Sequence, residues 1–200
     1  MKKKYKIIAT IQTRMGSSRL PNKALLDLGG KPSILRMIER VKLSKLISKI
    51  YIATSLSRED DSLASLVNKE KKICLYRGDE RNVLSRFYEI SKKEKAEIII
   101  RLTGDCPLID PFIIDQTIEL LILKKADYAS NTLKRTYPDG LDVEVFTASS
   151  LYSTYKNVRD SYSKEHVTPY IHGKSKKLFK TGTFKKASLE YVADFSYLRW

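Results

Sequence analysis

This 200-residue sequence predicts an α/β fold built on a mostly parallel sheet. Two observations support that prediction. Apolar runs rich in β-branched residues are typical of strands buried on both faces, and they alternate with segments of helical spacing. Strands separated by helices in this way form parallel βαβ units. The composition, 42% hydrophobic and 30% charged, is also that of a globular chain with a substantial core.

Most of the alternating elements are expected in the first 132 residues. The predicted strands cover 5–13, 49–54, 73–76, 97–102 and 126–130. The predicted helices cover 33–44, 58–68, 80–94 and 111–123. The last of these starts at Pro111, because proline suits the first turn of a helix. We interpret residues 1–132 as a nucleotide-binding α/β core.

The remaining residues, 133–200, have a different pattern and are expected to form a small α+β appendage within the same single domain. The prediction here is a strand at 140–147, helices at 148–157 and 164–172, and a hairpin that pairs 178–184 with 188–193. Repeats, low-complexity tracts and evident linkers are not found. We therefore expect one domain over 1–200.

Composition excludes several classes of protein. An apolar run near the ~20 residues of a membrane-spanning helix does not occur. The basic start is interrupted at Gln12 and Arg14, unlike a secretion signal. Two cysteines, Cys74 and Cys106, are too few for a disulfide framework or a four-ligand zinc site. The expectation is a soluble cytoplasmic protein with no membrane partner.

The net charge of +15 has three readings. A lysine-rich, solvated surface is one, a polyphosphate substrate is a second, and nucleic-acid binding with tyrosines stacked on bases is the third. The basic residues are spread along the whole chain, which favours the first reading and disfavours nucleic acid.

The loop that follows the first predicted strand is a candidate phosphate site. Residues 14–23 contain three cations, two serines and a glycine within ten positions. Arginine forks, a lysine point charge and the N–H groups near Gly16 suit phosphate oxygens. The chain has neither a G-x-x-x-x-G-K-[ST] nor a G-x-G-x-x-G motif, so a P-loop and a dinucleotide fold of that kind are not supported. An exposed basic loop without a ligand is the structural alternative.

A second polar loop, 103–108, follows the buried strand at 97–102. Ligands of parallel sheets bind at the carboxyl ends of strands, and an aspartate there is well placed to hold Mg²⁺ against phosphates. Asp105 is that residue, with Gly104 allowing close approach and a turn-stabilising role as the alternative. Cys106 is expected to pack rather than react.

The two loops together resemble the cytidylyltransferases that activate acidic sugars as CMP-sugars. The likeness is strongest to the spore-coat-polysaccharide type and more distant to CMP-3-deoxy-octulosonate and CMP-sialate synthetases. The blocks that carry it are QTRMGSSRLPNKAL at 12–25, GGKP at 29–32, RGDERNVLSRFY at 77–88, RLTGDCPLIDP at 101–111, YPDGLDVEVF at 137–146 and EHVTPYI at 165–171. This resemblance implies a three-layer α/β/α nucleotidyltransferase fold of the glycosyltransferase-A-like, Rossmann-like kind.

The resemblance also implies roles for individual residues. The residues expected to grip the CTP phosphates are Arg14, Ser17, Arg19 and Lys23, with Gly16, Ser18 and Thr103 beside them. Asp105 is the expected Mg²⁺ ligand. Arg77, Gly78 and Arg81 lie where such enzymes approach nucleotide and sugar. The stretch 142–144 and Glu165-His166 belong to the sugar-side and dimer-forming region, whereas His172 is expected at the surface.

The implied reaction transfers CMP from CTP to a sugar acid or related sugar, with release of pyrophosphate. Three alternatives remain open: use of another nucleoside triphosphate, an inactive nucleotide-binding protein, and, least favoured, an RNA-binding module. In the family a further stretch with a second Mg²⁺-binding aspartate would follow Trp200. We therefore expect exposed apolar residues around Val192, Phe195 and Leu198 that favour self-association, and no detectable Mg²⁺ site without CTP. The resemblance also implies a homodimer.

Overall fold

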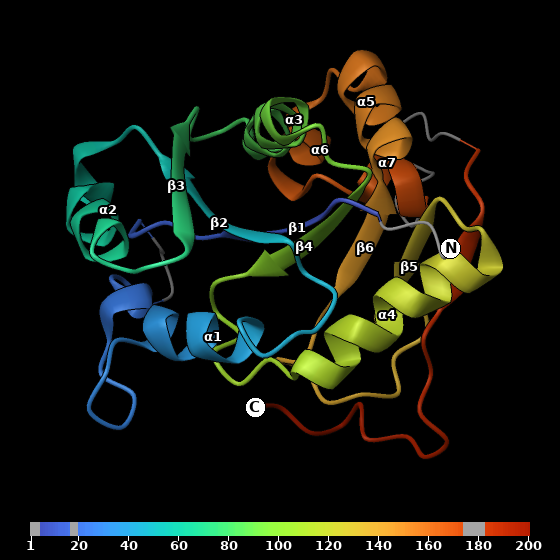
Figure 1. The fold of residues 1–200 in the computed structure, drawn as a ribbon, viewed down its shortest axis with the longest axis horizontal. Helices are drawn as coiled ribbons and strands as arrows, with labels where there is room; N and C mark the ends of the chain where they lie inside the picture. The colour runs from blue at the N-terminus through green and yellow to red at the C-terminus, as the bar shows by residue number, and fades with distance from the viewer. Residues whose placement is uncertain (1–4, 17–19, 174–182) are drawn as a thin grey trace.

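A seven-stranded sheet forms the centre of the molecule (Figure 1). The computed structural model describes residues 5–16, 20–173 and 183–200. The strands are β1 (Ile7–Gln12), β2 (Lys49–Ser55), β3 (Ile73–Gly78), β4 (Ile98–Thr103), β5 (Tyr128–Ser130), β6 (Glu144–Thr147) and β7 (Lys186–Ser188). Their order across the sheet is β3-β2-β1-β4-β6-β5-β7. All described neighbours pair in parallel except β6, which is antiparallel to β4 and to β5. The predicted mostly parallel sheet is confirmed.

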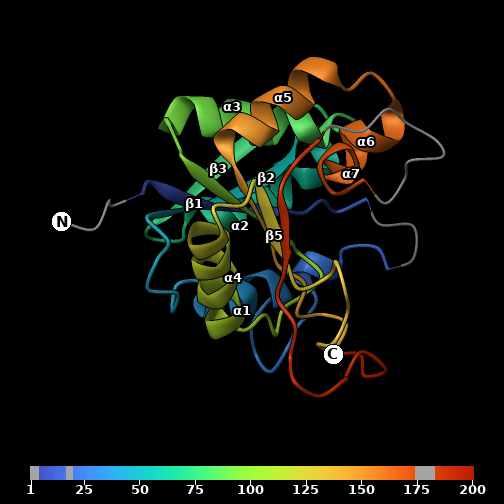
Figure 2. The same ribbon diagram turned by 90° about the vertical axis from the view of Figure 1, so that its right-hand side faces the viewer.

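Helices cover both faces of the sheet, which gives three layers (Figures 1 and 2). One face carries α1 (Ser33–Val41), α2 (Asp61–Asn68) and α4 (Pro111–Lys124). The other carries α3 (Val83–Glu94), α5 (Ala148–Asn157), α6 (Ser161–His166) and α7 (Pro169–His172). Short 3₁₀ turns, η1 (Lys23–Leu25) and η2 (Arg58–Asp60), follow β1 and β2.

Strand β1 shows how one short sequence serves both layers. Successive side chains of a strand point to opposite faces, so Ile7 and Ile11 enter the core beneath α1 and α4, while Ile8 enters the core beneath α3. All three are almost completely buried. Because both faces of β1 are covered, the strand is continuously apolar rather than alternating.

Local hydrogen bonds shift some predicted boundaries. Helix α3 begins at Val83 rather than near residue 80, because Asp79 Oδ1 accepts the N–H groups of Arg81 at 2.8 Å and Asn82 at 2.7 Å in a tight turn. Asn82 then caps the helix by accepting the N–H of Ser85 at 3.1 Å. Helix α4 begins at Pro111 as predicted, capped by the preceding aspartate.

The segment after residue 132 departs most from expectation. It contributes β6 and β7 to the same sheet, so it is continuous with the α/β core. The predicted hairpin is wrong for its described part, since Lys186–Ser188 pairs in parallel with β5; residues 174–182 lie outside the described residues. The predicted helix at 164–172 is two helices, α6 and α7, that are interrupted at Val167.

Long apolar helices are also not found where the structure describes the chain. Among the described residues the longest helix is α4, and its 14 residues are too few to cross a bilayer.

Candidate active site

The candidate site lies where the sheet changes direction. From β1 the chain moves outward to β2 and β3, and then returns to place β4 on the other side of β1. Ligands of open α/β sheets bind at such a switch point, beyond the carboxyl ends of the two strands. These ends are in register, because Gln12 pairs with Thr103 and the N–H of Gly104 donates to Gln12 O at 2.9 Å.

Gly104 allows the two loops to approach. A Cβ atom built on Gly104 would lie 2.6 Å from the Thr13 Cβ, closer than real Cβ atoms come. Any side chain at this position would therefore push the β1 loop away from the β4 loop. From the sequence, a glycine here is expected to permit close approach. In the structure, the segments that approach each other are the β1 loop and the β4 loop.

A cavity of about 660 Å³ opens at this point, here called the larger cavity. Five predicted residues line it: Arg14, Gly16, Lys23, Thr103 and Asp105. The structure thus brings together residues from two loops about 90 positions apart. Three further predicted residues, Ser17, Ser18 and Arg19, lie outside the described residues.

Lys23 and Asp105 form an ion pair in the lining of the larger cavity. Lys23 Nζ lies 2.9 Å from Asp105 Oδ2. Ser33 Oγ donates to the backbone carbonyl of Lys23 at 2.7 Å and so fixes the start of η1. Partial burial opposes ionisation of Asp105, but hydrogen bonds from Lys23 and Thr103 outweigh it and lower the pKa of this carboxyl. Asp105 is therefore an ionised carboxylate beside a cation.

Arg14 is positioned by two acidic residues. Its guanidinium lies 3.2 Å from Glu80 Oε1 and 3.7 Å from Glu165 Oε1. Glu80 precedes α3 and Glu165 belongs to α6, so Arg14 connects the β1 loop to two elements of the opposite layer. Because all three side chains are two-fifths or more exposed, an incoming phosphate can compete for the arginine.

A buried aspartate that the sequence analysis missed holds the β1 loop. Asp60 is 1% exposed and accepts the N–H of Met15 at 2.7 Å, the Thr54 hydroxyl at 2.7 Å and the N–H of Ser55 at 2.9 Å. Burial raises the pKa of Asp60, yet hydrogen bonds from Ser55, Met15 and Thr54 lower it further than burial raises it. The carboxylate thus ties the β1 loop to the end of β2. An aspartate in an unremarkable S-R-E-D sequence carried no signal for this role.

Among the described residues, Arg77, Gly78 and Arg81 line neither of the two cavities, so their approach to nucleotide and sugar stays a prediction. Arg77 donates to the carbonyls of Ser55 at 2.9 Å and Ser57 at 2.8 Å, so it braces the end of β2. Arg81 is exposed in the turn before α3.

Gly78 acts through a neighbour instead. A Cβ atom at Gly78 would lie 2.9 Å from Arg86 Cγ, so the glycine makes room for that arginine. Arg86 is 2% exposed, lines the larger cavity and donates to the carbonyls of Ala53 and Glu80, both at 3.1 Å. Burial lowers the pKa of Arg86, partly offset by the charge of Asp60. The burial of Arg86, which lies among the apolar residues of α3, was not predicted from the sequence.

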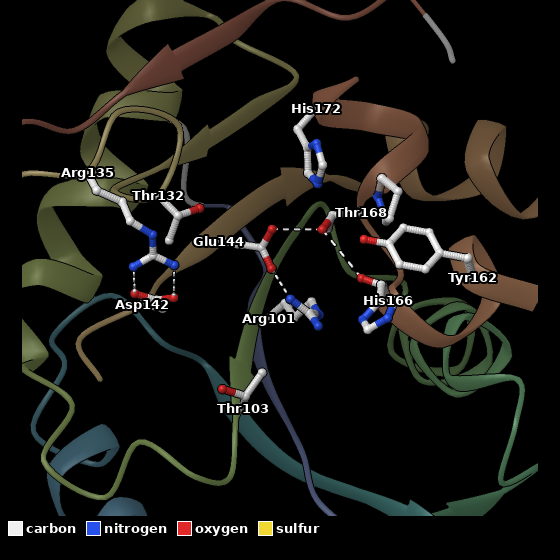
Figure 3. A pocket seen from close by; sticks show the side chains of 11 residues that line it. Arg101, Thr103, Thr132, Arg135, Asp142, Glu144, Tyr162, His166, Thr168 and His172 are labelled. Carbon is white, nitrogen blue, oxygen red and sulfur yellow. Dashed lines mark hydrogen bonds and ion pairs between the residues drawn. The ribbon is translucent and has the colours of Figure 1, made fainter. Parts of the chain in front are cut away.

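A second cavity of about 220 Å³ adjoins the first and is here called the smaller cavity (Figure 3). Polar side chains from the sheet, the segment after β5 and helices α6 and α7 line it, as Figure 3 shows. Arg135 donates through both terminal nitrogens to Asp142, at 2.9 and 2.7 Å. That bidentate pair raises the pKa of Arg135. Asp142 was expected here, whereas Arg135 was missed.

Glu144 forms the buried wall of the smaller cavity. It pairs with Arg101 and accepts a hydrogen bond from Thr168 Oγ1 at 2.7 Å (Figure 3). It also accepts a hydrogen bond from Tyr128 Oη at 2.6 Å. Burial alone would raise the pKa of Glu144; the Arg101 charge and these hydrogen bonds lower it instead. The glutamate therefore remains an anion in a buried network.

Two lining residues are common to both cavities, Thr103 and His166. The two cavities therefore meet beside these two side chains. His172 also lines the smaller cavity and is only partly exposed, which corrects the expectation that it lies at the surface. Its place on α7 depends on the interruption at Val167, which spacing did not predict.

A cavity lined by cations at the switch point of a mostly parallel sheet, with helices on both faces, is typical of nucleotide-binding α/β proteins. The family model for cytidylyltransferases matches residues 8–196, and the chain belongs to that family.

Individual relatives agree with the family assignment. The spore coat polysaccharide biosynthesis protein SpsF of Bacillus subtilis is 37% identical over 171 residues, which cover 82% of this chain and 69% of that protein. The 3-deoxy-manno-octulosonate cytidylyltransferase of Geobacter sulfurreducens is 35% identical over 156 residues, covering 74% of this chain and 60% of that enzyme. A solved cytidylyltransferase from Leptospira borgpetersenii superposes with a TM-score of 0.86 at 31% identity, covering 98% of this chain and 79% of that one.

Proposed function

We propose that this chain transfers CMP from CTP to a sugar acid and releases pyrophosphate, in the synthesis of a surface polysaccharide. The observation that carries the proposal is the pair of adjoining cavities. The larger has Lys23, Arg14 and Asp105 at the switch point, and the smaller has a polar lining suited to a polyhydroxylated acceptor. The names of the two relatives above, one in spore coat polysaccharide biosynthesis and one acting on 3-deoxy-manno-octulosonate, support the choice of acceptor.

In this reaction an acceptor hydroxyl oxygen bonds to the α-phosphorus of CTP, and the bond from that phosphorus to the bridging oxygen breaks. The electron pair leaves with pyrophosphate. Such transfers depend on positioning and on neutralising phosphate charge. Arg14 and Lys23 would exchange their acidic partners for phosphate oxygens. Arg86, fixed beneath the cavity, adds positive potential that does not move.

The site also fits Mg²⁺, provided that the nucleotide completes the shell. The described residues contain no cluster of three or more His, Cys, Asp or Glu side chains able to hold a metal ion. Asp105 is ionised and lines the larger cavity, and Mg²⁺ is commonly held by one or two carboxylates together with substrate phosphates and waters. When bound, Mg²⁺ supplies charge to the developing phosphate oxygens. Lys23 would then pass from Asp105 to a phosphate.

A panel of four nucleoside triphosphates, each with and without Mg²⁺, tests the nucleotide half of the proposal. We expect CTP with Mg²⁺ to raise the melting temperature more than ATP, GTP or UTP, because a ligand that binds the native state stabilises it. Equal shifts for all four would retain a phosphate site and reject CTP specificity. Mg²⁺ alone is expected to produce no shift.

Pyrophosphate release with 3-deoxy-manno-octulosonate or its 8-amino-3,8-dideoxy analogue, the substrates in the names of the relatives, tests the acceptor half. Lys23→Ala should weaken CTP binding by roughly 10- to 100-fold, the value of a charge-assisted hydrogen bond. Lys156→Ala, an exposed lysine of α5, is the matched control. Normal CTP affinity in Lys23→Ala would reject this assignment of the site.

We further propose that the enzyme works as a cytoplasmic homodimer. The expectation of exposed apolar side chains near the end of the chain is confirmed for Val192, Phe195 and Leu198, which are 97%, 37% and 39% exposed. Apolar side chains gathered on a surface favour association. Sedimentation equilibrium of the wild type and of Val192→Asp should show a dimer in the first and a weaker one in the second.

A further inference from the structure

The turn between α6 and α7 has a strained backbone. Val167 has φ 67° and ψ −54°, outside the usual regions for a β-branched residue. The N–H of Thr168 donates to His166 O at 2.7 Å, which closes a three-residue γ-turn of the rare, positive-φ kind. Such strain persists only where surrounding structure over-determines it, and it is concentrated at functional sites.

The surroundings of this turn are rigid. The side chain of Val167 is fully buried in the core beneath α3 and α5, and its N–H donates to Ser163 O at 2.9 Å. Thr168 is 2% exposed and its hydroxyl donates to the buried Glu144. The residues on either side of the strained position are thus held from the core and from the wall of the smaller cavity.

What this turn presents to the site is His166. Its side chain lines both cavities, a property that among the described lining residues it shares with Thr103 alone. The acceptor hydroxyl must lie between the cavities to reach the α-phosphorus. A threonine hydroxyl is a poor proton acceptor, whereas imidazole is the side chain that most often takes a proton in such steps.

Three acidic side chains that line the cavities are already engaged. Glu165 lies 3.7 Å from Arg14 and lines only the larger cavity. Asp142 is held in the bidentate pair with Arg135. Glu144 is buried against Arg101, which lowers its pKa and weakens it as a base.

We propose that His166 is the catalytic general base of the reaction described above, on which this inference rests. As the acceptor oxygen bonds to the α-phosphorus, its proton passes to the imidazole, and pyrophosphate leaves with the electron pair of the broken bond. His166 then returns the proton to solvent. The γ-turn at Val167 holds the imidazole at the boundary of the two cavities, where nucleotide and acceptor would meet. Figure 3 shows His166 in the lining of the smaller cavity.

Kinetics of His166→Gln and His166→Ala test the proposal with CTP and 3-deoxy-manno-octulosonate or its 8-amino analogue. We expect kcat to fall roughly 10²- to 10⁴-fold, the range for loss of a general base, with CTP affinity within about threefold of wild type. The decline of kcat/KM at low pH should disappear in both variants. The charged and titratable side chains that line the cavities around His166 are Arg14, Lys23, Arg86, Arg101, Asp105, Arg135, Asp142, Glu144, Tyr162, Glu165, His172 and Arg199.

His172→Gln is the matched control, because that histidine lines only the smaller cavity. It should raise KM for the acceptor and retain the decline at low pH. A kcat within about threefold of wild type in His166→Gln, or a low-pH decline that survives in it, overturns the proposal.

A second measurement needs no turnover. The chain has only two histidines, so their imidazole signals in an NMR spectrum are assigned by one variant. The signal of His166 should move when CTP with Mg²⁺ is added and again with the acceptor, whereas the signal of His172 should respond mainly to the acceptor. A His166 signal that ignores bound CTP refutes the inference and leaves the cytidylyltransferase proposal intact. A protein that binds no CTP refutes both.

Discussion

Removing the carboxylate of Glu144 should destabilise the fold strongly. The ion pair of Glu144 with Arg101 is enclosed: the side chains are 10% and 13% exposed. Glu144→Ala would leave Arg101 without its counter-charge and would also remove the acceptor for Tyr128 and Thr168. Breaking a buried pair from one side costs about 3–5 kcal/mol. A typical domain has only about 5–15 kcal/mol in total, so the variant should be marginal.

Urea unfolding at pH 7 measures this effect as a change in midpoint at constant slope. Two further variants show how much of the loss comes from the unpaired Arg101 charge and how much depends on the burial of the ion pair. Arg101→Met combined with Glu144→Leu should recover the part of the loss that comes from the unpaired Arg101 charge, because apolar residues of similar size often replace a buried pair at little cost. Tyr128 and Thr168 would still lack their acceptor, so the recovery should be incomplete. Asp142→Ala, which breaks the partly exposed pair with Arg135, should cost less than about 1 kcal/mol. A loss below about 1 kcal/mol in Glu144→Ala would refute the reasoning, and so would a double variant as unstable as the single one.

Three shorter predictions concern the loops and the pH dependence of stability. Gly104→Ala should lower the free energy of unfolding by about 1–3 kcal/mol and weaken CTP binding, because the new Cβ meets the Thr13 Cβ at 2.6 Å. Unchanged midpoints in urea and CTP titrations would show that the two loops can separate freely. Asp60→Asn should weaken CTP binding more than it alters the secondary structure seen by circular dichroism, since it loosens the loop at Met15. Hydrogen bonds from Lys49 and Tyr51 lower the pKa of Glu94 to about 2, although desolvation opposes this shift. The contribution of Glu94 to the free energy of unfolding is therefore complete above the ordinary glutamate pKa near 4.5, and it is lost as the pH falls toward 2. Thermal unfolding of Glu94→Gln should therefore depend less on pH in that window than unfolding of the wild type.

The order of elements along the first 132 residues follows from local patterns in the sequence. Runs such as the one that forms β1 are continuously apolar because both faces are covered, and that pattern is visible without a structure. The positions of Lys23 and Asp105 were equally predictable, because parallel strands carry their loops to one edge of the sheet. Both statements depend on neighbours in sequence and on a general rule of parallel sheets.

What only the tertiary structure decided are contacts between distant segments that pattern does not encode. Arg77 and Arg86 are both arginines in one predicted block, yet one braces β2 and the other lies under the larger cavity, where Gly78 leaves room for it. The antiparallel insertion of β6 between β4 and β5 depends on long-range pairing, and its alternating pattern suits an appendage as well as a sheet. The turn at Val167 opposes local propensity outright, and only the surrounding core holds it there. His166 reaches the boundary between the cavities because packing energy of the whole domain exceeds the local cost of that turn.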